Sequence, residues 1–414
     1  MKFSKFSASP AKGVRRWGSL SQLLLVSAVA LAVSSLLTAC QLVTIDFVFL
    51  ASSSPSAGGQ IQTFAVDSQS GALRNGPPAV DAGGTSPVAM ATTADYANLY
   101  VANSDNNTVV HFAIATNGVL TQKDKVTLAG PPASVAVNQA GTYLYVVSGD
   151  TTATLSEYAL SSGAIGNLVA QVALTIPGNT GDQVVPTGVT TLVNNGAVYA
   201  IVYDKSSYNP GGVTTSTAHP GWLFGFGIGS GGVLTPAAAS PYQAGVKPSG
   251  IVADQTNRFV YVTDYASNQL IGYTIYSGDV LNYMISGPYR TGAQPTAIAI
   301  DPRAKYLYVS NGLDSSVTAY AIDLATGIPS QAINSTGSQI NSTDTQPVSI
   351  AVDPALGRFV FTANYLGNSA SGFFLNPNTG QLTPSEQTPY PTFQHPTALV
   401  SVPHGNHAIQ VVTP

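Results

Sequence analysis

A four-part hydrophobic pattern repeats along most of the chain. Each copy opens with a proline, two small residues and an alternating apolar stretch, as in residues 295–300. Short apolar runs with period-two alternation, bounded by Gly, Asn or Asp, predict β-strands. Seven copies begin 45 to 62 residues apart, at Pro87, Pro132, Pro186, Pro248, Pro295, Pro347 and Pro396.

Three more strands follow the proline-led strand in each copy. A tight turn leads to a second apolar run such as residues 307–309, and an alternating run such as 317–322 comes next. A glycine turn then opens a short fourth strand, at Gly71, Gly118, Gly163, Gly232, Gly278, Gly327 and Gly380. Four strands in a repeat of about 50 residues predict one blade of a β-propeller, because stacked blades bury the faces that a lone sheet exposes.

The pattern therefore predicts an all-β fold, a seven-bladed β-propeller with four antiparallel strands per blade. The first unit lacks a proline-led strand, and the last unit stops after its second strand. We expect the last blade to be shared between the termini, with outer strands from residues 47–73 and inner strands from 396–412. Residues 46–51 and 408–412 both resemble its second strand, and the sequence leaves open which of them fills it.

The first 39 residues differ from the repeats. They hold no acidic residue, and an apolar run at 20–37 follows five basic residues, which is typical of a secretory signal. The run ends in Leu37-Thr38-Ala39-Cys40, which resembles the lipobox of bacterial lipoproteins and implies cleavage and lipid attachment at Cys40. An uncleaved membrane anchor is the alternative, because a span needs about 20 apolar residues.

These features predict the domain organisation and the cellular location of the protein. We expect a signal peptide at 1–39, a tether at 40–44 and one propeller domain at 45–414. The protein should be exported and anchored to a membrane through Cys40, in the periplasm or at the cell surface. Gln41 does not resemble an inner-membrane retention signal, which favours the outer membrane. Cys40 is the only cysteine, so no intramolecular disulfide can form.

Charged residues are scarce. Only 8% of the 414 residues are charged, with 15 Lys and Arg against 19 Asp and Glu, whereas soluble domains carry about 25%. A hydrophobic content of 44% argues against disorder. The lack of a basic face argues against nucleic-acid binding. We expect a monomer that needs no cofactor and binds a sugar, a peptide or an envelope protein.

The repeat also resembles a known family. Its form Pro-x-x-Ile-Ala-Val-Asp-Pro, then Leu-Tyr-Val-x-Asn, then Gly-x-Leu, clearest in 295–328 and 347–382, is similar to the lactonase-type seven-bladed propellers, which include bacterial 6-phosphogluconolactonases. In active members, His, Arg and Glu side chains point into the axial funnel, and lactone hydrolysis needs a base and a cation there. The matching positions here are small, as in Thr296-Ala297 and Ser249-Gly250, and Gly312 stands where the family carries Glu.

Few residues remain as catalytic candidates. Arg290, Glu386 and His395 precede inner strands and would lie on the face where a funnel opens, or else are scattered polar residues on exposed connections. Glu157 falls within a third strand and is interpreted as structural. His404 and His407 lie three residues apart, but two histidines without a third ligand do not make a metal site. We therefore expect no metal and interpret both as exposed turn residues.

The longest repeat carries an insertion at residues 204–221. Function in propellers lies on such loops, and Trp and Tyr are favoured binding anchors. Tyr208, His219 and Trp222 are therefore candidate binding residues, and a loop without a partner is the alternative. The favoured function is a binding or scaffolding module at the cell envelope, and the alternative is a lactone hydrolase of the 6-phosphogluconolactonase type.

Overall fold

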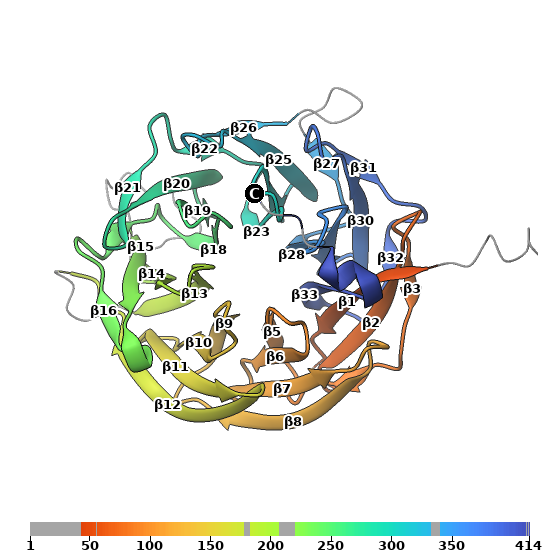
Figure 1. The fold of residues 1–414 in the computed structure, drawn as a ribbon, viewed down its shortest axis with the longest axis horizontal. Helices are drawn as coiled ribbons and strands as arrows, with labels where there is room; N and C mark the ends of the chain where they lie inside the picture. The colour runs from red at the N-terminus through yellow and green to blue at the C-terminus, as the bar shows by residue number, and fades with distance from the viewer. Residues whose placement is uncertain are drawn as a thin grey trace, which may run out of the picture. The chain divides into compact units, whose positions relative to one another are not determined.

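Seven antiparallel sheets stand around a central axis, as Figure 1 shows. The computed structural model describes residues 43–54, 56–177, 183–206, 220–332, 340–410, 412 and 414. Residues from Thr44 onward form one unit. The predicted seven-bladed β-propeller is confirmed, and each blade has four principal strands.

Six blades follow one another along the chain, each with its innermost strand first. Blades 1 and 2 are β5 (Pro87–Thr92), β6 (Asn98–Asn103), β7 (Thr108–Ile114) and β8 (Leu120–Thr127), then β9 (Pro132–Val137), β10 (Tyr143–Ser148), β11 (Thr154–Ser161) and β12 (Ala164–Ala173). Blades 3 and 4 are β13 (Val184–Thr191), β14 (Ala197–Asp204), β15 (Gly221–Ile228) and β16 (Leu234–Pro236), then β18 (Pro248–Ala253), β19 (Phe259–Asp264), β20 (Gln269–Tyr276) and β21 (Val280–Tyr283). Blades 5 and 6 are β23 (Pro295–Ile300), β24 (Tyr306–Asn311), β25 (Ser316–Ile322) and β26 (Pro329–Gln331), then β28 (Pro347–Val352), β29 (Phe359–Asn364), β30 (Ser369–Leu375) and β31 (Leu382–Pro384).

Five blades carry an additional short strand that pairs with the third strand beside the fourth. These strands are β4 (Val80–Asp81), β17 (Tyr242–Gln243), β22 (Tyr289–Arg290), β27 (Ile340–Ser342) and β32 (Tyr390–Pro391). The outer edge of these blades is therefore broken into two pieces, whereas β8 and β12 run on as continuous edge strands.

Blade 7 joins the two ends of the chain. Its order is β33 (Pro396–Pro403) innermost, then β1 (Thr44–Ser52), β2 (Gln60–Asp67) and β3 (Leu73–Asn75). The predicted sharing is confirmed, and the open choice is decided for the N-terminal segment, since Asp46 pairs with Pro403. The expectation of several inner strands from 396–412 is wrong: the C-terminal segment gives one strand and then turns into the 3-10 helix η2 (Gly405–Ile409).

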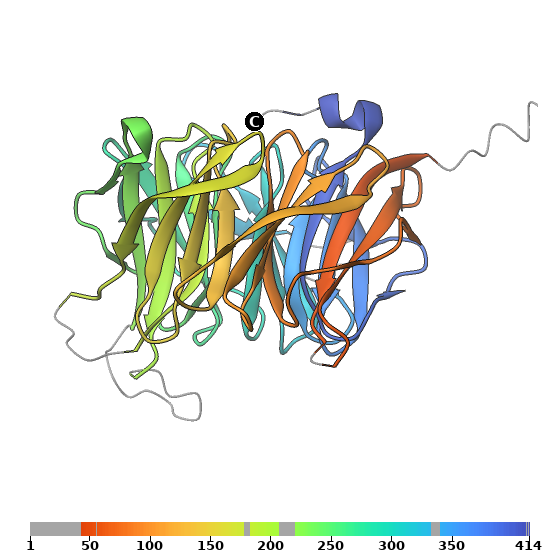
Figure 2. The same cartoon turned by 90° about the horizontal axis from the view of Figure 1, so that it is seen from below.

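The strand directions give the ring two distinct faces. All seven inner strands run in the same direction. Six of them begin with a proline and β13 has Pro186 as its third residue, so the face where they begin is here called the proline face. The opposite face, where the strands end, is here called the turn face. The ends of β14 and β15 that flank the insertion lie at the proline face, and η2 lies at the turn face (Figure 2). Apart from η2, the described residues contain one other short 3-10 helix, η1 (Ser230–Gly232), and no helix long and apolar enough to span a membrane.

The core is divided into seven hydrophobic clusters, one in each gap between neighbouring blades. A fully buried tyrosine on the second strand recurs in blades 1 to 5. In blade 5 the Tyr308 hydroxyl donates a 3.0 Å hydrogen bond to the carbonyl of Gly380, in the glycine turn of blade 6. Tyr100 and Tyr261 make the same bond to Gly163 and Gly327 of their next blades. These bonds explain why the repeat keeps both the tyrosine and the glycine.

Candidate functional site

The axial channel is the first place to look for chemistry, because every blade contributes its innermost strand to the wall. It encloses about 410 Å³. The lining consists of small, aliphatic and hydroxyl side chains with Tyr96 and Met90, and none of the described lining residues is charged or a histidine. Serine and threonine hydroxyl groups come from all seven blades, at Thr92, Ser134, Thr187, Ser249, Thr296, Ser349, Thr397 and Ser401.

Several channel hydroxyls make hydrogen bonds within the ring. Ser249 donates a 2.6 Å hydrogen bond to the carbonyl of Pro295, and Thr296 donates one of 2.7 Å to the carbonyl of Pro347. Each bond therefore joins one blade to the first residue of the next. Thr397 donates to the carbonyl of Ala51 within blade 7 at 3.2 Å. These hydroxyl groups therefore connect inner strands to their neighbours. No basic side chain among the described lining residues could activate them as nucleophiles.

The three catalytic candidates occupy different parts of the ring. Arg290 is exposed on β22, at the outer edge of blade 4, and Glu386 is exposed beyond β31, in the outer part of blade 6. His395 precedes β33 and stacks on Tyr365, with ring centroids 4.8 Å apart. Within the described part of the chain, no hydrogen bond or ion pair joins any two of these candidates.

The structure describes only some of the other residues that the sequence analysis named as candidates. Cys40, Tyr208 and His219 lie outside the described residues. Trp222 is the second residue of β15, beside the insertion, where it pairs with Val202 and Gln243 and packs against the hydrophobic cluster between blades 2 and 3. Its ring therefore serves partly as core. Glu157 lies on β11 with a fully buried side chain.

A second cavity lies between blades 3 and 4, away from the channel. It encloses about 310 Å³, close to the lower limit for small-molecule sites. Ile271, Met284 and Pro288 give it an apolar wall, and Tyr283, half exposed, stands at its rim. The side-chain oxygen of Gln243 is buried beside it without a hydrogen-bond partner. The cavity thus combines an aromatic ring with a free hydrogen-bond acceptor.

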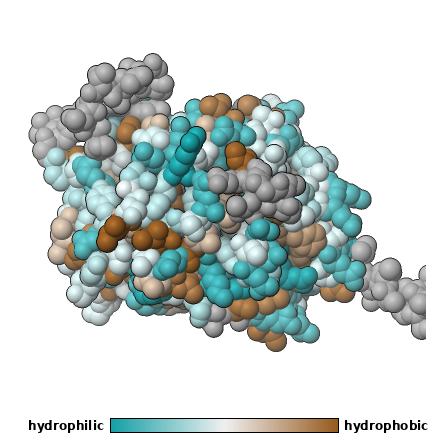
Figure 3. Space-filling view, turned by 90° about the horizontal axis from the view of Figure 1, so that it is seen from above, coloured by the Kyte–Doolittle hydropathy of each residue, from teal (hydrophilic) through white to brown (hydrophobic). Residues whose placement is uncertain are grey.

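The side of the ring drawn in Figure 3 shows no large apolar face among the described residues. Figure 3 shows apolar side chains in small groups that polar ones separate. The described exposed apolar residues include Leu168 of blade 2, Tyr276 and Ile285 of blade 4 and Leu366 of blade 6. Singly exposed apolar residues are ordinary for soluble proteins.

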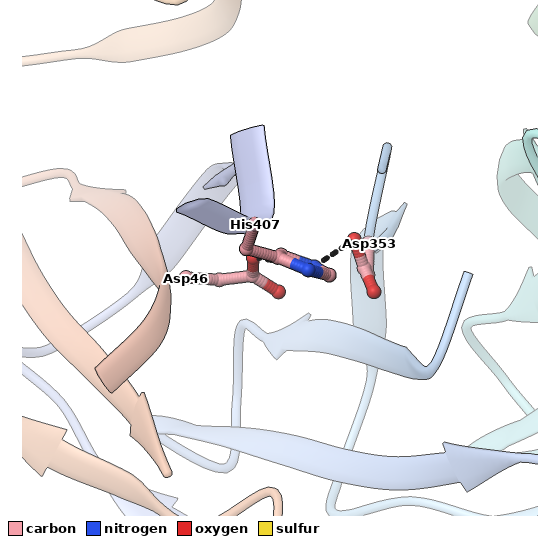
Figure 4. A group of neighbouring side chains, drawn as sticks. All are labelled: Asp46, Asp353 and His407. Carbon is pink, nitrogen blue, oxygen red and sulfur yellow. Dashed lines mark hydrogen bonds and ion pairs between the residues drawn. The ribbon is translucent and has the colours of Figure 1, made fainter. Parts of the chain in front are cut away.

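Three ionisable side chains meet where blade 7 closes against blade 6. Asp46 comes from β1, Asp353 from the turn after β28 and His407 from η2, and they point toward one another (Figure 4). Nε2 of His407 lies 3.3 Å from Oδ1 of Asp46 and 3.2 Å from Oδ1 of Asp353. Both aspartates are fully buried, and His407 is only 5% exposed.

The two carboxyl groups of this cluster differ in environment. Burial raises the pKa of Asp46 well above its ordinary value, repulsion from Asp353 adds to the rise, and Arg358 opposes it. Burial also opposes ionisation of Asp353, but hydrogen bonds from His407 and from the backbone N–H groups of Arg358 and Ala355 outweigh it and lower the pKa. Asp353 is therefore the carboxylate of the pair, and Asp46 resists ionisation.

The interpretation of both histidines as exposed turn residues is wrong for His407, which is buried, and His404 is partly buried with its ring edge-on to Phe47. The aspartates that join His407 come from 361 and 54 residues earlier in the chain. The repeat alone marks Asp353, since Asp254 and Asp301 occupy the same turn in blades 4 and 5. Asp46 carries no such signal in the sequence.

Comparison with known proteins places this geometry in a family. The family model "Lactonase, 7-bladed beta-propeller" matches residues 47–215 and 232–336, which is more than half of the chain. The chain belongs to the lactonase family of seven-bladed β-propellers. A search of curated protein sequences finds no significant match.

Solved structures extend the likeness of this lactonase-family propeller at the level of fold. The periplasmic gluconolactonase of Pseudomonas aeruginosa is 18% identical, with a TM-score of 0.70 over 87% of this chain and 99% of that one. A protein of Bacteroides fragilis, to which 6-phosphogluconolactonase activity is ascribed, is 16% identical, with a TM-score of 0.68 over 87% and 98% of the two chains. Hydrazine synthase of Kuenenia stuttgartiensis, at 15% identity, also matches, with a TM-score of 0.55 over 78% and 94%. The fold therefore occurs with different chemistries.

Proposed function

We propose that this lactonase-family propeller is an exported, lipid-anchored binding module of the cell envelope. The observation that carries the proposal is the channel, whose described lining holds no charged side chain and no histidine. Lactone hydrolysis needs a base for water and a donor for the developing oxyanion. The small residues at Ser249-Gly250 and Thr296-Ala297 supply neither.

The cavity between blades 3 and 4 is the proposed ligand site. An aromatic ring beside a hydrogen-bonding group suits a sugar, whose C–H face packs on the ring while a hydroxyl donates to a free acceptor. Tyr283 provides the ring and the Gln243 side chain provides the acceptor. The Tyr283 ring is held in place, because its hydroxyl donates to the backbone carbonyl of Gln243 and its face contacts Tyr273.

The first experiment tests for turnover. The purified protein is incubated with glucono-1,5-lactone and with 6-phosphogluconolactone, and acid release is followed against spontaneous ring opening. We expect no turnover above background. Turnover that collapses in both Arg290→Ala and His395→Ala would reject the binding module.

The second experiment tests the cavity with free sugars, namely glucose, galactose, N-acetylglucosamine and their disaccharides. Saturation-transfer NMR should show contact with at least one of them in the wild type, and Tyr283→Ala should abolish it. Tyr276→Ala is the matched control, because Tyr276 is 56% exposed on the same blade, close to the 55% of Tyr283, but lies outside the cavity. Equal loss in both variants, or no contact with any sugar, contradicts the proposed site.

A lactone hydrolase is the second candidate function. Family membership and the likeness to the periplasmic gluconolactonase support it. In that case His395, at the proline face, is the one candidate base placed beside an inner strand, and a partner for it would have to come from another blade. The turnover experiment separates the two functions.

A further inference from the structure

The cluster of Asp46, Asp353 and His407 has a spacing that suits a metal ion. Its three possible ligand atoms all lie within 4.8 Å of one another. Zinc binds His nitrogen and carboxylate oxygen at about 2.0–2.2 Å in a tetrahedron, so neighbouring ligand atoms stand roughly 3.3–3.5 Å apart. The distances of 3.3 and 3.2 Å from Nε2 of His407 to the two aspartate oxygens are close to this separation between neighbouring ligand atoms.

Three polar atoms of the cluster also make no hydrogen bond. Both carboxylate oxygens of Asp46 are buried and make no hydrogen bond, and neither does Nδ1 of His407. Buried polar atoms without partners are rare and costly in folded proteins. A fully buried carboxyl group that makes no hydrogen bond and faces a second carboxylate and an imidazole is an arrangement that a cation would satisfy.

Charge points the same way. When both carboxyl groups are ionised they repel each other across the cluster, and one protonated imidazole would balance only one of them. Arg358, whose charge acts on Asp46, donates from Nη2 to the backbone carbonyl of Ser68. A divalent ion would balance both carboxylates and leave His407 neutral, which is the form that binds metals.

Asp353 is already oriented as a ligand. Its Oδ1 accepts the N–H of Ala355 at 2.9 Å, and its Oδ2 accepts the N–H of Arg358 at 3.0 Å. Backbone bonds of this kind fix ligating carboxylates in metal sites. Asp254 makes similar turn bonds in blade 4, but no histidine or second carboxylate joins it among the described residues.

We propose that Asp46, Asp353 and His407 form a binding site for a single divalent transition-metal ion of the zinc class. The ion would cross-link three segments that are distant in the chain, namely the N-terminal strand β1, the turn after β28 and the C-terminal η2. Three protein ligands leave a fourth position for water. The site is separate from the channel and from the cavity between blades 3 and 4, so it stands whether the proposed function holds or fails.

Metal titration tests the proposal directly. The purified protein, treated with chelator and dialysed, is titrated with ZnCl₂ in a calorimeter. We expect one equivalent to bind, and Asp46→Asn and His407→Gln should each weaken binding by about 100-fold or more. His404→Gln, in the same segment but outside the cluster, and Asp254→Asn, in the matching turn of blade 4, should bind as the wild type does.

Two readouts on the wild type protect the test against variants that fail to fold. Co²⁺ in place of zinc should give the visible absorption bands of a four-coordinate site. Zinc should also slow amide exchange at residues 404–410, because the ion ties η2 to the ring. If the wild type binds neither ion stoichiometrically, or if the cluster variants bind as well as the controls, the proposal is wrong and the cluster is an ion pair.

Discussion

Tyr145 and Glu157 lie opposite each other on β10 and β11, and neither side chain has a hydrogen-bond partner although both are fully buried. In blades 3 to 5 the residue opposite the tyrosine is Gly225, Gly272 or Ala319. Blade 2 carries a glutamate there, and its Oε1 lies beside the glycine turn at Gly232 of the next blade. The glutamate thus stands at the turn where Tyr308 and its equivalents make their bond.

This glutamate makes stability depend on pH. Burial raises the pKa of Glu157 from an ordinary value of 4.5 to about 7. Since the folded chain holds the proton more tightly than the unfolded chain, its contribution is full below about pH 4.5 and is lost as pH rises toward 7. Glu157→Gln should remove this loss and raise the unfolding free energy at pH 8 by about 3 kcal/mol, with little effect at pH 4.5.

Urea unfolding at both pH values measures the effect. Glu386→Gln is the control, because Glu386 is the other glutamate of the chain and is exposed. A gain at pH 8 that is no larger for Glu157→Gln than for the control would show that the buried carboxyl group does not govern this range.

The hydrogen bond between blades 5 and 6 should be measurable on its own. Tyr308→Phe removes the donor to Gly380 and leaves that buried carbonyl unpaired, so we expect a loss of about 1–2 kcal/mol. Tyr145→Phe deletes a hydroxyl that has no partner and should be neutral or stabilising. Denaturant midpoints of the two variants give the comparison, and equal losses would contradict it.

Closure of the ring through β33 should be essential. Removing residues 396–414 takes away the inner strand of blade 7, exposes the edge of β1 and opens the wall of the channel. We expect the shortened protein to lose its cooperative thermal transition and to associate, as unpaired edges do. Circular dichroism and sedimentation velocity test this, and a monomer that melts like the wild type would contradict it.

The lipid anchor remains a prediction from the sequence. Cys40→Ser should block processing or release the protein from membranes, because the lipid needs the thiol. Fractionation with an antibody to the propeller measures the change. A serine variant that stays with membranes as the wild type does would refute the lipobox interpretation, and Ser54→Ala, in the turn after β1, is a suitable unaffected control.

The sequence predicts the ring well because the repeat is local. Pro295, Tyr308 and Gly380 each serve one defined place in a blade, and the same contacts recur from blade to blade. The sharing of blade 7 also follows from the missing strands at the ends. The sequence does not decide whether residues 46–51 or 408–412 form the second strand of that blade, because both segments are short and apolar. The pairing of β1 with β33 decides it.

The candidate sites could not be predicted in the same way. Asp46 and His407 meet only because the termini share a blade, and no spacing in the sequence brings them together. The cavity at Tyr283 depends on how β17 and β20 pack between two blades. Arg290 and Glu386 looked equivalent in the sequence because both precede an inner strand, yet both lie in outer parts of their blades.

The order of strands in blade 7 has a consequence for biosynthesis. β1 is among the first segments of the propeller to leave the ribosome, but its inner neighbour β33 is made about 350 residues later, which takes roughly 20–70 s. Until then β1, whose side chains are almost all buried in the finished ring, has one unpaired edge. The newborn chain therefore needs something to shield that edge, and folding finishes only after the last residues have been added.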